Sequence, residues 1–312
     1  MKKHRRNPFV TLEIPNPFPH LLRAPQTFWV RGQESALHLL EELPEKGLAI
    51  VGTRRPQPRS LEQIREQLGA LRNTDLIIAS GLARGIDSCA HLAALNHGLK
   101  TVAFLGTSLD DIYPHENFAL AYDIIDDGGL VVSEVPPQEK TQPWRFLMRN
   151  RFIAGLTKAT WVVAAGERSG ALNTAQWALD HGKDLYVTPS FPGDPALAGN
   201  QKLLSRGAFP FWSCQDLGMT WPGILSQVEL PLLEKPKPVR PKTDSELLTQ
   251  AVDEWTHSSG GVPLESLLAW ATQKKWEPQR FFNALMQSIQ HKQVDQKQGV
   301  LFAPQSAPLQ VT

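Results

Sequence analysis

Residues 47–71 read GLAIVGTRRPQPRSLEQIREQLGAL, and this stretch decides the fold. Its first five residues are apolar and partly β-branched, which is typical of a buried β-strand. Ser60 and Gln63 have the spacing of a capping box, and apolar residues from Leu61 to Leu71 follow at helical spacing. A strand, a glycine-containing loop and a helix therefore follow one another, as in the first half of a βαβ unit.

The alternation of strand and helix patterns continues beyond this unit. Asp87 is a candidate cap for a helix that ends at Gly98, and a helix over about residues 172–181 joins the last two strands. Such alternation predicts an α/β fold with a Rossmann-like, mostly parallel sheet and helices on both faces. The further strands are expected at residues 76–79, 101–105, 130–132, 160–164 and 184–187.

The composition changes after the sheet region. Residues 229–242 are rich in proline and lysine, a composition that stays extended. Beyond them, helix patterns at 246–255, 264–271 and 279–291, and a hairpin with its turn at Gln298-Gly299, predict a small winged-helix-like domain. The predicted organisation is an N-terminal arm and lead-in strand (1–46), a Rossmann-like domain (47–228), a Pro/Lys-rich linker (229–242), a winged-helix-like domain (243–304) and a tail (305–312).

The amino-acid composition limits the classes of protein to which this sequence can belong. The chain has 312 residues, 41% of them hydrophobic, which suits one large α/β domain with a smaller partner. The net charge of +1 means that any nucleic-acid-binding surface has to be local. Cys89 and Cys214 are the only cysteines, and their wide separation predicts neither a disulfide framework nor a zinc site. Without a long apolar stretch or a signal peptide, we expect a cytoplasmic location and no membrane partner.

Small and basic residues follow the ends of several predicted strands. Because the carboxyl ends of parallel strands meet at one edge of a sheet, we expect these loops to border a shared crevice. Glycine lets backbone amides approach an anion, helix N-termini add partial positive charge, and arginine offers a planar fork to phosphate. For any single loop, the alternative is that its glycines serve turn geometry alone. The candidate phosphate-binding residues in these loops are Gly52, Thr53, Arg54, Ser80, Gly81, Arg84, Gly85, Ser169 and Gly170.

Residues 144–151 read WRFLMRNR and interleave arginines with aromatic rings. This pattern suits single-stranded nucleic acid, because guanidinium groups bind phosphate and aromatic rings stack on bases. A solvated helix face with a few buried aromatics is the alternative. The candidate DNA-binding residues in this segment are Phe146, Arg149, Asn150 and Arg151.

Signatures of common enzyme classes are missing from the sequence. The loop after the first strand is GTRRP rather than GxGxxG, and there is no GxxxxGK[ST] loop for a triphosphate. There is no HExxH motif, and Ser169 is one residue out of register with a GxSxG nucleophile elbow. We therefore expect no catalytic residue, no metal and no cofactor, and we predict that the protein is not an enzyme.

Taken together, the loops resemble those of the DNA-processing protein A family, also called Smf. Gly52-Thr53-Arg54 matches the family's Gly-x-Arg loop, and residues 80–87 match its Ser-Gly-Leu-Ala-x-Gly-Ile-Asp loop. Further matches are Tyr113-Pro114 with Asn117, Ser133-Glu134, Arg149-Asn150-Arg151, Ser169-Gly170 and Gly199-Asn200. The resemblance implies a domain that binds single-stranded DNA, with Asn200 in its site. It also implies a homodimer that protects incoming DNA and helps load the RecA recombinase in natural transformation.

The residues themselves leave two functions open. The first is binding of single-stranded DNA. The alternative is a Rossmann nucleotide-binding or nucleotide-processing protein, in which the glycine loops hold one small phosphorylated ligand. Arginines spread over several loops favour the longer polyanion. The third helix of the smaller domain carries few basic residues, among them Arg280 and His291, which disfavours strong binding to duplex DNA.

Overall fold

The computed structural model describes residues 10–15, 17–190, 194–224, 243–259, 262–291, 294–297 and 300–302. The chain divides into two compact units, Met1–Leu232 and Leu233–Thr312. The predicted linker and tail, the basic residues 1–6 and the turn at Gln298-Gly299 lie outside the described residues.

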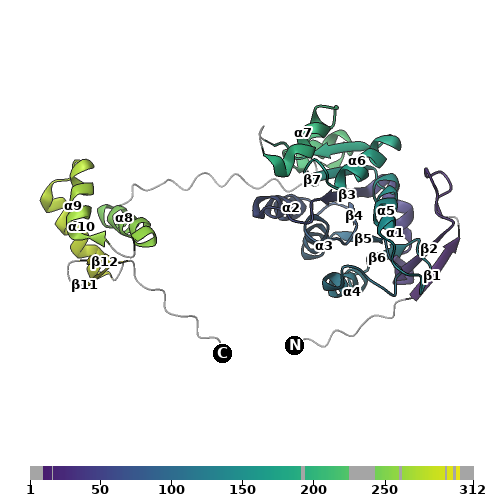
Figure 1. The fold of residues 1–312 in the computed structure, drawn as a ribbon, viewed down its shortest axis with the longest axis horizontal. Helices are drawn as coiled ribbons and strands as arrows, with labels where there is room; N and C mark the ends of the chain where they lie inside the picture. The colour runs from purple at the N-terminus through teal and green to yellow at the C-terminus, as the bar shows by residue number, and fades with distance from the viewer. Residues whose placement is uncertain are drawn as a thin grey trace. The chain divides into compact units, whose positions relative to one another are not determined.

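The larger unit is built on a nine-stranded sheet. Its strands are β1 (Val10–Pro15), β2 (Thr27–Gly32), β3 (Gly47–Gly52), β4 (Ile77–Ser80), β5 (Lys100–Leu105), β6 (Leu130–Ser133), β7 (Ala159–Ala164), β8 (Asp184–Val187) and β9 (Phe209–Pro210). They lie in the order β1-β2-β6-β5-β4-β3-β7-β8-β9, and Figure 1 labels the strands from β1 to β7. The strands from β3 to β9 pair in parallel, whereas β1 with β2 and β2 with β6 are antiparallel. The predicted α/β fold with a mostly parallel sheet is therefore confirmed.

Helices cover both faces of this sheet. They are α1 (His38–Lys46), α2 (Pro58–Ala70), α3 (Ile86–Asn96), α4 (Phe118–Asp126), α5 (Pro143–Leu156), α6 (Ala171–Asp180) and α7 (Ala198–Leu204), with 3-10 turns at Glu34–Ala36, His115–Asn117, Pro195–Leu197 and Cys214–Met219. Side chains of a strand alternate between the two faces. Ala49 and Val51 of β3 pack in a core with α1, α5, α6 and α7, whereas Leu48 and Ile50 pack in a core with α2 and α3. Helix α4 covers β5 and β6 on the α3 side.

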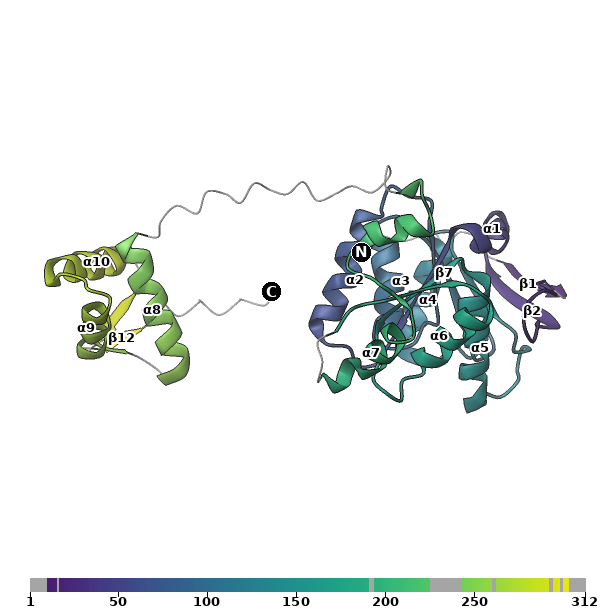
Figure 2. The same cartoon turned by 90° about the horizontal axis from the view of Figure 1, so that it is seen from above.

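The order in which strands join the sheet reverses at β3. Strands β4, β5 and β6 lie on one side of β3, and β7 and β8 lie on the other. The carboxyl ends of β3 and β7 therefore border the topological switch point, which is where open α/β sheets bind ligands. Helices α5 and α6 lie side by side and both contact β3, so the helix with the interleaved arginines is close to this point (Figure 2).

Two predictions about helix starts are wrong. Ser60 lies inside α2, whose N-cap is Gln57 without a side-chain cap bond, because Pro58 already starts the helix at its first position. Asp87 is not the cap of α3 either, since that helix begins one residue before it and its N-cap is Gly85. The patterns also did not predict β1 and α1, both of which belong to the larger unit.

The smaller unit contains α8 (Asp244–Ser259), α9 (Leu264–Gln273) and α10 (Pro278–Gln290), which overlap the three predicted helices. Its strands are β10 (Val262–Pro263), β11 (Asp295–Lys297) and β12 (Val300–Phe302), in the order β10-β12-β11. Val252, Leu267 and Phe281 lie in its apolar core. The guanidinium of Arg280 donates to the Asp244 carboxylate at 2.8 and 2.6 Å. Among the helices that the structure describes in either unit, none has the length and apolar character needed to cross a membrane.

Candidate functional site

A cavity of about 510 Å³ lies at the switch point. Its wall is formed by the loop after β3, by α5 and by the loop between β7 and α6. We call it the switch-point cavity. It brings together eight of the predicted site residues, namely Gly52, Thr53, Arg54, Phe146, Arg149, Asn150, Ser169 and Gly170.

A second cavity, of about 230 Å³, adjoins the first. The two cavities share a wall, because both are lined by Arg54, Arg55, Ala83, Phe146 and Arg149. We call this one the tyrosine cavity, and the two together the groove. The rest of the lining of the tyrosine cavity is Gly81, Arg84, Tyr113 and Pro114.

Exposed arginines supply positive charge along the groove. Arg54 and Arg55 are exposed, and neither forms an ion pair with another residue that the structure describes. Arg84 pairs with Glu116 at 2.7 Å, but both side chains are about half exposed. An exposed pair of this kind contributes little free energy, so Arg84 can exchange its partner for another anion.

Arg149 lies at the floor of the groove and is 4% exposed. Its Nη1 donates to the carbonyl oxygen of Phe104, whereas its Nε has no hydrogen-bond partner among the described residues. Burial lowers the pKa of Arg149 to about 10, and the charge of Asp87 opposes this shift. Arg149 is therefore a cation at neutral pH with one buried donor that the surrounding protein does not satisfy.

Two titratable groups of α3 lie within electrostatic range of Arg149. Burial raises the pKa of Asp87, while the charge of Arg149 lowers it, and Oδ2 of Asp87 accepts a hydrogen bond from Gly81 N at 3.2 Å. Nδ1 of His91 lies 2.7 Å from Thr101 Oγ1, and burial, helped by Arg149, lowers the pKa of His91 to about 3. Asp87 therefore holds the loop after β4, and His91 stays neutral.

Packing inside the protein requires several of the predicted glycines, Gly52 and Gly81 among them. A Cβ atom on Gly52 would lie 2.6 Å from Ile86 Cγ1, and one on Gly81 would lie 2.1 Å from Arg149 Nη1. At Gly170, by contrast, a Cβ atom would meet only Leu147, at 4.0 Å. Close packing alone therefore explains the glycines at 52 and 81, and a bulky residue at either position would disturb the fold as well as the groove.

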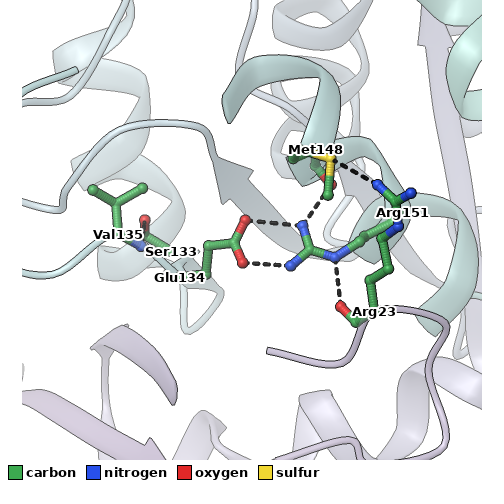
Figure 3. Close-up of polar contacts among 6 residues, drawn as sticks. All are labelled: Arg23, Ser133, Glu134, Val135, Met148 and Arg151. Carbon is green, nitrogen blue, oxygen red and sulfur yellow. Dashed lines mark hydrogen bonds and ion pairs between the residues drawn. The ribbon is translucent and has the colours of Figure 1, made fainter. Parts of the chain in front are cut away.

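Arg151 lines neither cavity. Figure 3 shows its guanidinium against Glu134, with Nη1 2.9 Å from Oε1 and Nη2 bonded to Oε2. Its Nη1 also donates to the carbonyl of Met148, and its Nε donates to the carbonyl of Arg23, both at 2.8 Å. The side chain is 6% exposed. Since each nitrogen already has a protein acceptor, Arg151 connects α5 to the residues just after β6 and to the segment before β2, and we assign it a positioning role.

Three other predicted site residues make internal contacts instead of lining the groove. The buried Ser80 hydroxyl donates to the carbonyl of Ile50 at 2.6 Å. The Asn200 amide is fully buried and makes one accepted and two donated hydrogen bonds to the backbone around β7 and β8, at 2.7 to 3.0 Å. Gly85 is the N-cap of α3 with φ of 81°. These residues fix the loops that border the groove.

The aromatic residues of α5 lie on different sides of the helix. Positions 144 and 146 are about 200° apart around an α-helix. Phe146 lines the groove, whereas Trp144 is 56% exposed and lines a separate cavity of about 420 Å³ together with Glu139 and Arg145. The interleaved pattern therefore contributes one ring to the groove and not two.

The groove residues missing from the sequence-based candidates include Arg55, Arg168 and Tyr113. Tyr113 is 43% exposed, and its ring centroid lies 5.5 Å from that of Phe146. The sequence marks Tyr113-Pro114 only as part of the family resemblance. Its place in the loop after β5 is a usable signal, because loops at the carboxyl ends of parallel strands face the ligand crevice.

Comparison with known proteins identifies the family. Residues 9–222 match the family model for DNA recombination-mediator protein A. The chain belongs to this family. Its relatives include DNA processing protein DprA from Bacillus subtilis, 36% identical over 170 residues, and protein Smf from Escherichia coli, 37% identical over 184 residues. The aligned parts cover 54% and 59% of this chain but only 57% and 48% of those relatives, so the chain spans about half the length of the curated proteins that it matches. The resemblance predicted from the motifs is confirmed.

Solved structures of family members share the fold. DprA from Streptococcus pneumoniae is 33% identical with a TM-score of 0.61, over 70% of this chain and 75% of that one. DNA processing protein A from Helicobacter pylori is 30% identical with a TM-score of 0.60, over 71% of this chain and 97% of that one. The Helicobacter pylori structure is described as giving insight into a single-stranded DNA binding mode.

Proposed function

We propose that this chain binds single-stranded DNA in the groove. One observation carries the proposal: two adjoining cavities at the switch point of a parallel sheet share a wall of arginines and one aromatic ring. A single strand combines regularly spaced phosphates with exposed base faces. Arginine and aromatic side chains are the groups that bind these two features in proteins that hold single strands.

The proposed contacts with DNA differ with the solvent exposure of each groove side chain. Arg54 and Arg55 are exposed, so they bind phosphate groups at the rim of the groove. Arg149 adds a nearly buried positive charge at the floor, where a charge-assisted hydrogen bond is stronger than in water. Phe146 stacks on a base, because it lies in the wall that the two cavities share. Arg151 takes no direct part.

The rival function is binding of one phosphorylated nucleotide in the switch-point cavity. Its volume of about 510 Å³ supports this, since small-ligand pockets run from roughly 300 to 1,000 Å³. A ligand confined to that cavity, however, leaves Arg84 and Tyr113 without a role, because they line only the tyrosine cavity. A strand that passes through both cavities uses all of the cations, which is why we favour DNA.

From family membership we also propose the biological setting. The chain acts as a homodimer that protects incoming DNA and helps load the RecA recombinase during natural transformation. The family's description as a recombination mediator supports this role. We propose that the chain binds DNA without catalysing a reaction on it. Among the described residues, no group of three or more His, Cys, Asp or Glu side chains could hold a metal ion.

Fluorescence polarisation tests the proposal. A labelled oligo-dT of about 20 nucleotides, longer than the footprint of roughly 4–16 nucleotides seen for one single-strand-binding domain, is titrated with the protein beside a duplex of equal length. We expect tighter binding of the single strand, weakened in Arg54→Ala. Arg206→Ala, which removes an exposed arginine that lines neither cavity, is the matched control and should bind as the unmodified protein does. Equal affinity for single strand and duplex, or competition by a mononucleotide at low concentration, supports the rival.

A further inference from the structure

Asp87 is an acidic side chain in a groove that is otherwise cationic or uncharged. Among the described residues that line the two cavities, Asp87 alone is acidic, whereas five are arginines, namely Arg54, Arg55, Arg84, Arg149 and Arg168. An acidic group in a cavity that holds a polyanion repels its ligand. Its presence in the lining of the switch-point cavity therefore needs an explanation.

The contacts of Asp87 show what its carboxyl group does. Oδ2 of Asp87 accepts a hydrogen bond from Gly81 N at 3.2 Å, and the backbone amide of Ala83 also bonds to this carboxyl group. Both amides belong to the short loop between β4 and the start of α3. Loops of this kind, between a strand and a helix N-terminus, bind phosphate through their amides in other open α/β sheets. In this protein the acceptor is a side chain of α3 itself.

Asp87 also compensates the charge of Arg149 at the floor of the groove. The two residues are 6% and 4% exposed. Burial raises the pKa of Asp87 and lowers that of Arg149 to about 10, and in each case the charge of the other residue opposes the shift. Each therefore favours the charged form of the other. A phosphate at the floor would meet the negative charge of Asp87 as well as the positive charge of Arg149.

The start of α6 provides a contrast within the same cavity. Gly170 and Ala171 line the switch-point cavity, and the first turn of α6, which the structure describes in full, contains no acidic residue. The amide of Ala171 donates to the hydroxyl of Ser169 at 3.3 Å, and a hydroxyl carries no charge that repels an anion. Of these two helix starts at the cavity, that of α3 therefore has an internal anion and that of α6 does not.

We propose that Asp87 is a specificity-determining residue, whose carboxyl group fills the place at the floor of the switch-point cavity where a phosphate would otherwise bind. Phosphates are then held by the exposed arginines of the rim. A DNA strand reaches several of these arginines at once, whereas a single nucleotide does not and binds weakly. The inference rests on the proposed function, since it explains why a strand and not one nucleotide is the ligand.

The test compares three variants of the full chain. Asp87→Ala removes the carboxyl group, and Asp87→Asn keeps its volume and one acceptor oxygen but removes its charge. Asp184→Ala is the matched control, because the Asp184 carboxylate also accepts an internal hydrogen bond, from Thr220, but lines neither cavity. Equilibrium dialysis measures the binding of radiolabelled inorganic phosphate and of dTMP, and fluorescence polarisation measures the binding of oligo-dT.

We expect Asp87→Ala to bind phosphate and dTMP at least about tenfold more tightly than the unmodified protein does, the equivalent of one additional charge-assisted hydrogen bond. Affinity for oligo-dT should change less, because its phosphates are already held at the rim. The preference for the strand over dTMP should therefore fall. Asp87→Asn should lie between the two proteins, since its amide still fills the place, and Asp184→Ala should bind all three ligands as the unmodified protein does.

A gain of affinity separates this role from a purely structural one. If Asp87 only held the loop after β4, its loss would weaken the binding of all three ligands together, and an unfolded variant would bind none of them. Circular dichroism checks that each variant is folded. If Asp87→Ala does not fold, Asp87→Ser takes its place, because the serine hydroxyl can still accept one amide hydrogen bond while leaving room for an anion.

The outcomes distinguish this inference from the proposed function. If the unmodified protein fails to bind oligo-dT, the proposed function is wrong, and a gain of phosphate affinity in Asp87→Ala would still support the filling of the floor by Asp87. If the unmodified protein binds oligo-dT, but the folded Asp87→Ala or Asp87→Ser protein binds phosphate and dTMP no more tightly, the role assigned to Asp87 is wrong.

Discussion

Replacing Arg54 by alanine tests the electrostatic part of the groove. Arg54 is exposed, lines both cavities and has no ion-pair partner among the described residues, so its removal should not change stability. A hydrogen bond from an exposed guanidinium to phosphate lies at the lower end of the charge-assisted range, about 1.5 kcal/mol. That corresponds to a loss of roughly tenfold in affinity for single-stranded DNA, whatever its sequence.

Salt dependence gives the sharper test of this variant. Each phosphate neutralised on a single strand contributes about 0.7 to the slope of log affinity against log salt, so a fourfold rise in salt weakens one contact by about 2.6-fold. The deficit of Arg54→Ala should therefore shrink by about that factor between the two salt concentrations. Arg54→Lys should recover part of the affinity and the whole slope, since an ammonium keeps the charge but not the planar fork. An Arg54→Ala protein with unchanged affinity and slope would show that the strand does not pass this rim.

Three further predictions concern the residues around the groove. Arg151→Ala should lower the free energy of unfolding by about 3 kcal/mol in urea titrations, because it leaves the Glu134 carboxylate unpaired. The double variant Arg151→Ala/Glu134→Ala should recover part of this loss. Equal stability of the unmodified protein and both variants would contradict a stabilising role for the buried pair. His91 has a pKa of about 3 in the folded protein and about 6.5 in the unfolded chain, so the unfolded state binds more protons between these values. Its contribution to stability is complete above pH 6.5 and is lost as the pH falls towards 3; the pH dependence of unfolding should be shallower in His91→Asn, and an unchanged pH dependence would refute the assignment. A chain that ends at residue 228 should keep most of the affinity for oligo-dT, since all residues that line the groove precede residue 175. If the folded truncation loses binding, the binding site does not lie in the groove alone.

Local sequence pattern was sufficient for the central sheet. Buried parallel strands such as β3 and β7 are continuous apolar runs, and the helices between them have clear periodicity. The outer elements gave weaker signals. Strand β1 is mostly exposed, and α1 contains Pro44, which argues against a helix when only local propensity is considered. Helix α1 forms because the larger unit buries Leu39, Leu40 and Leu43, and β1 forms by pairing with β2, both tertiary effects that a short window cannot contain.

The site was predictable only to the level of its loops. The rule that ligands bind at the carboxyl ends of parallel strands located Gly52-Thr53-Arg54 and Ser169-Gly170 in one cavity. It could not separate the arginines that face solvent from those that hold the protein together. Arg151 is satisfied by Glu134, 17 residues away, and by the carbonyl of Arg23, 128 residues away. Partners so distant in the sequence leave no trace in the pattern around Arg151 itself.

The three arginines of the WRFLMRNR segment contribute unequally to the charge of the groove. Arg145 bonds to Glu139 and Arg151 to Glu134, and only Arg149 lines the groove. Positions 149 and 151 are about 200° apart around the helix, so both cannot face the same ligand. The cations that DNA can neutralise therefore come mainly from the loops after β3, β4 and β7, while α5 supplies one buried arginine and one ring. The salt slope of binding should accordingly respond to Arg54, Arg55, Arg84 and Arg168, and not to Arg145 or Arg151.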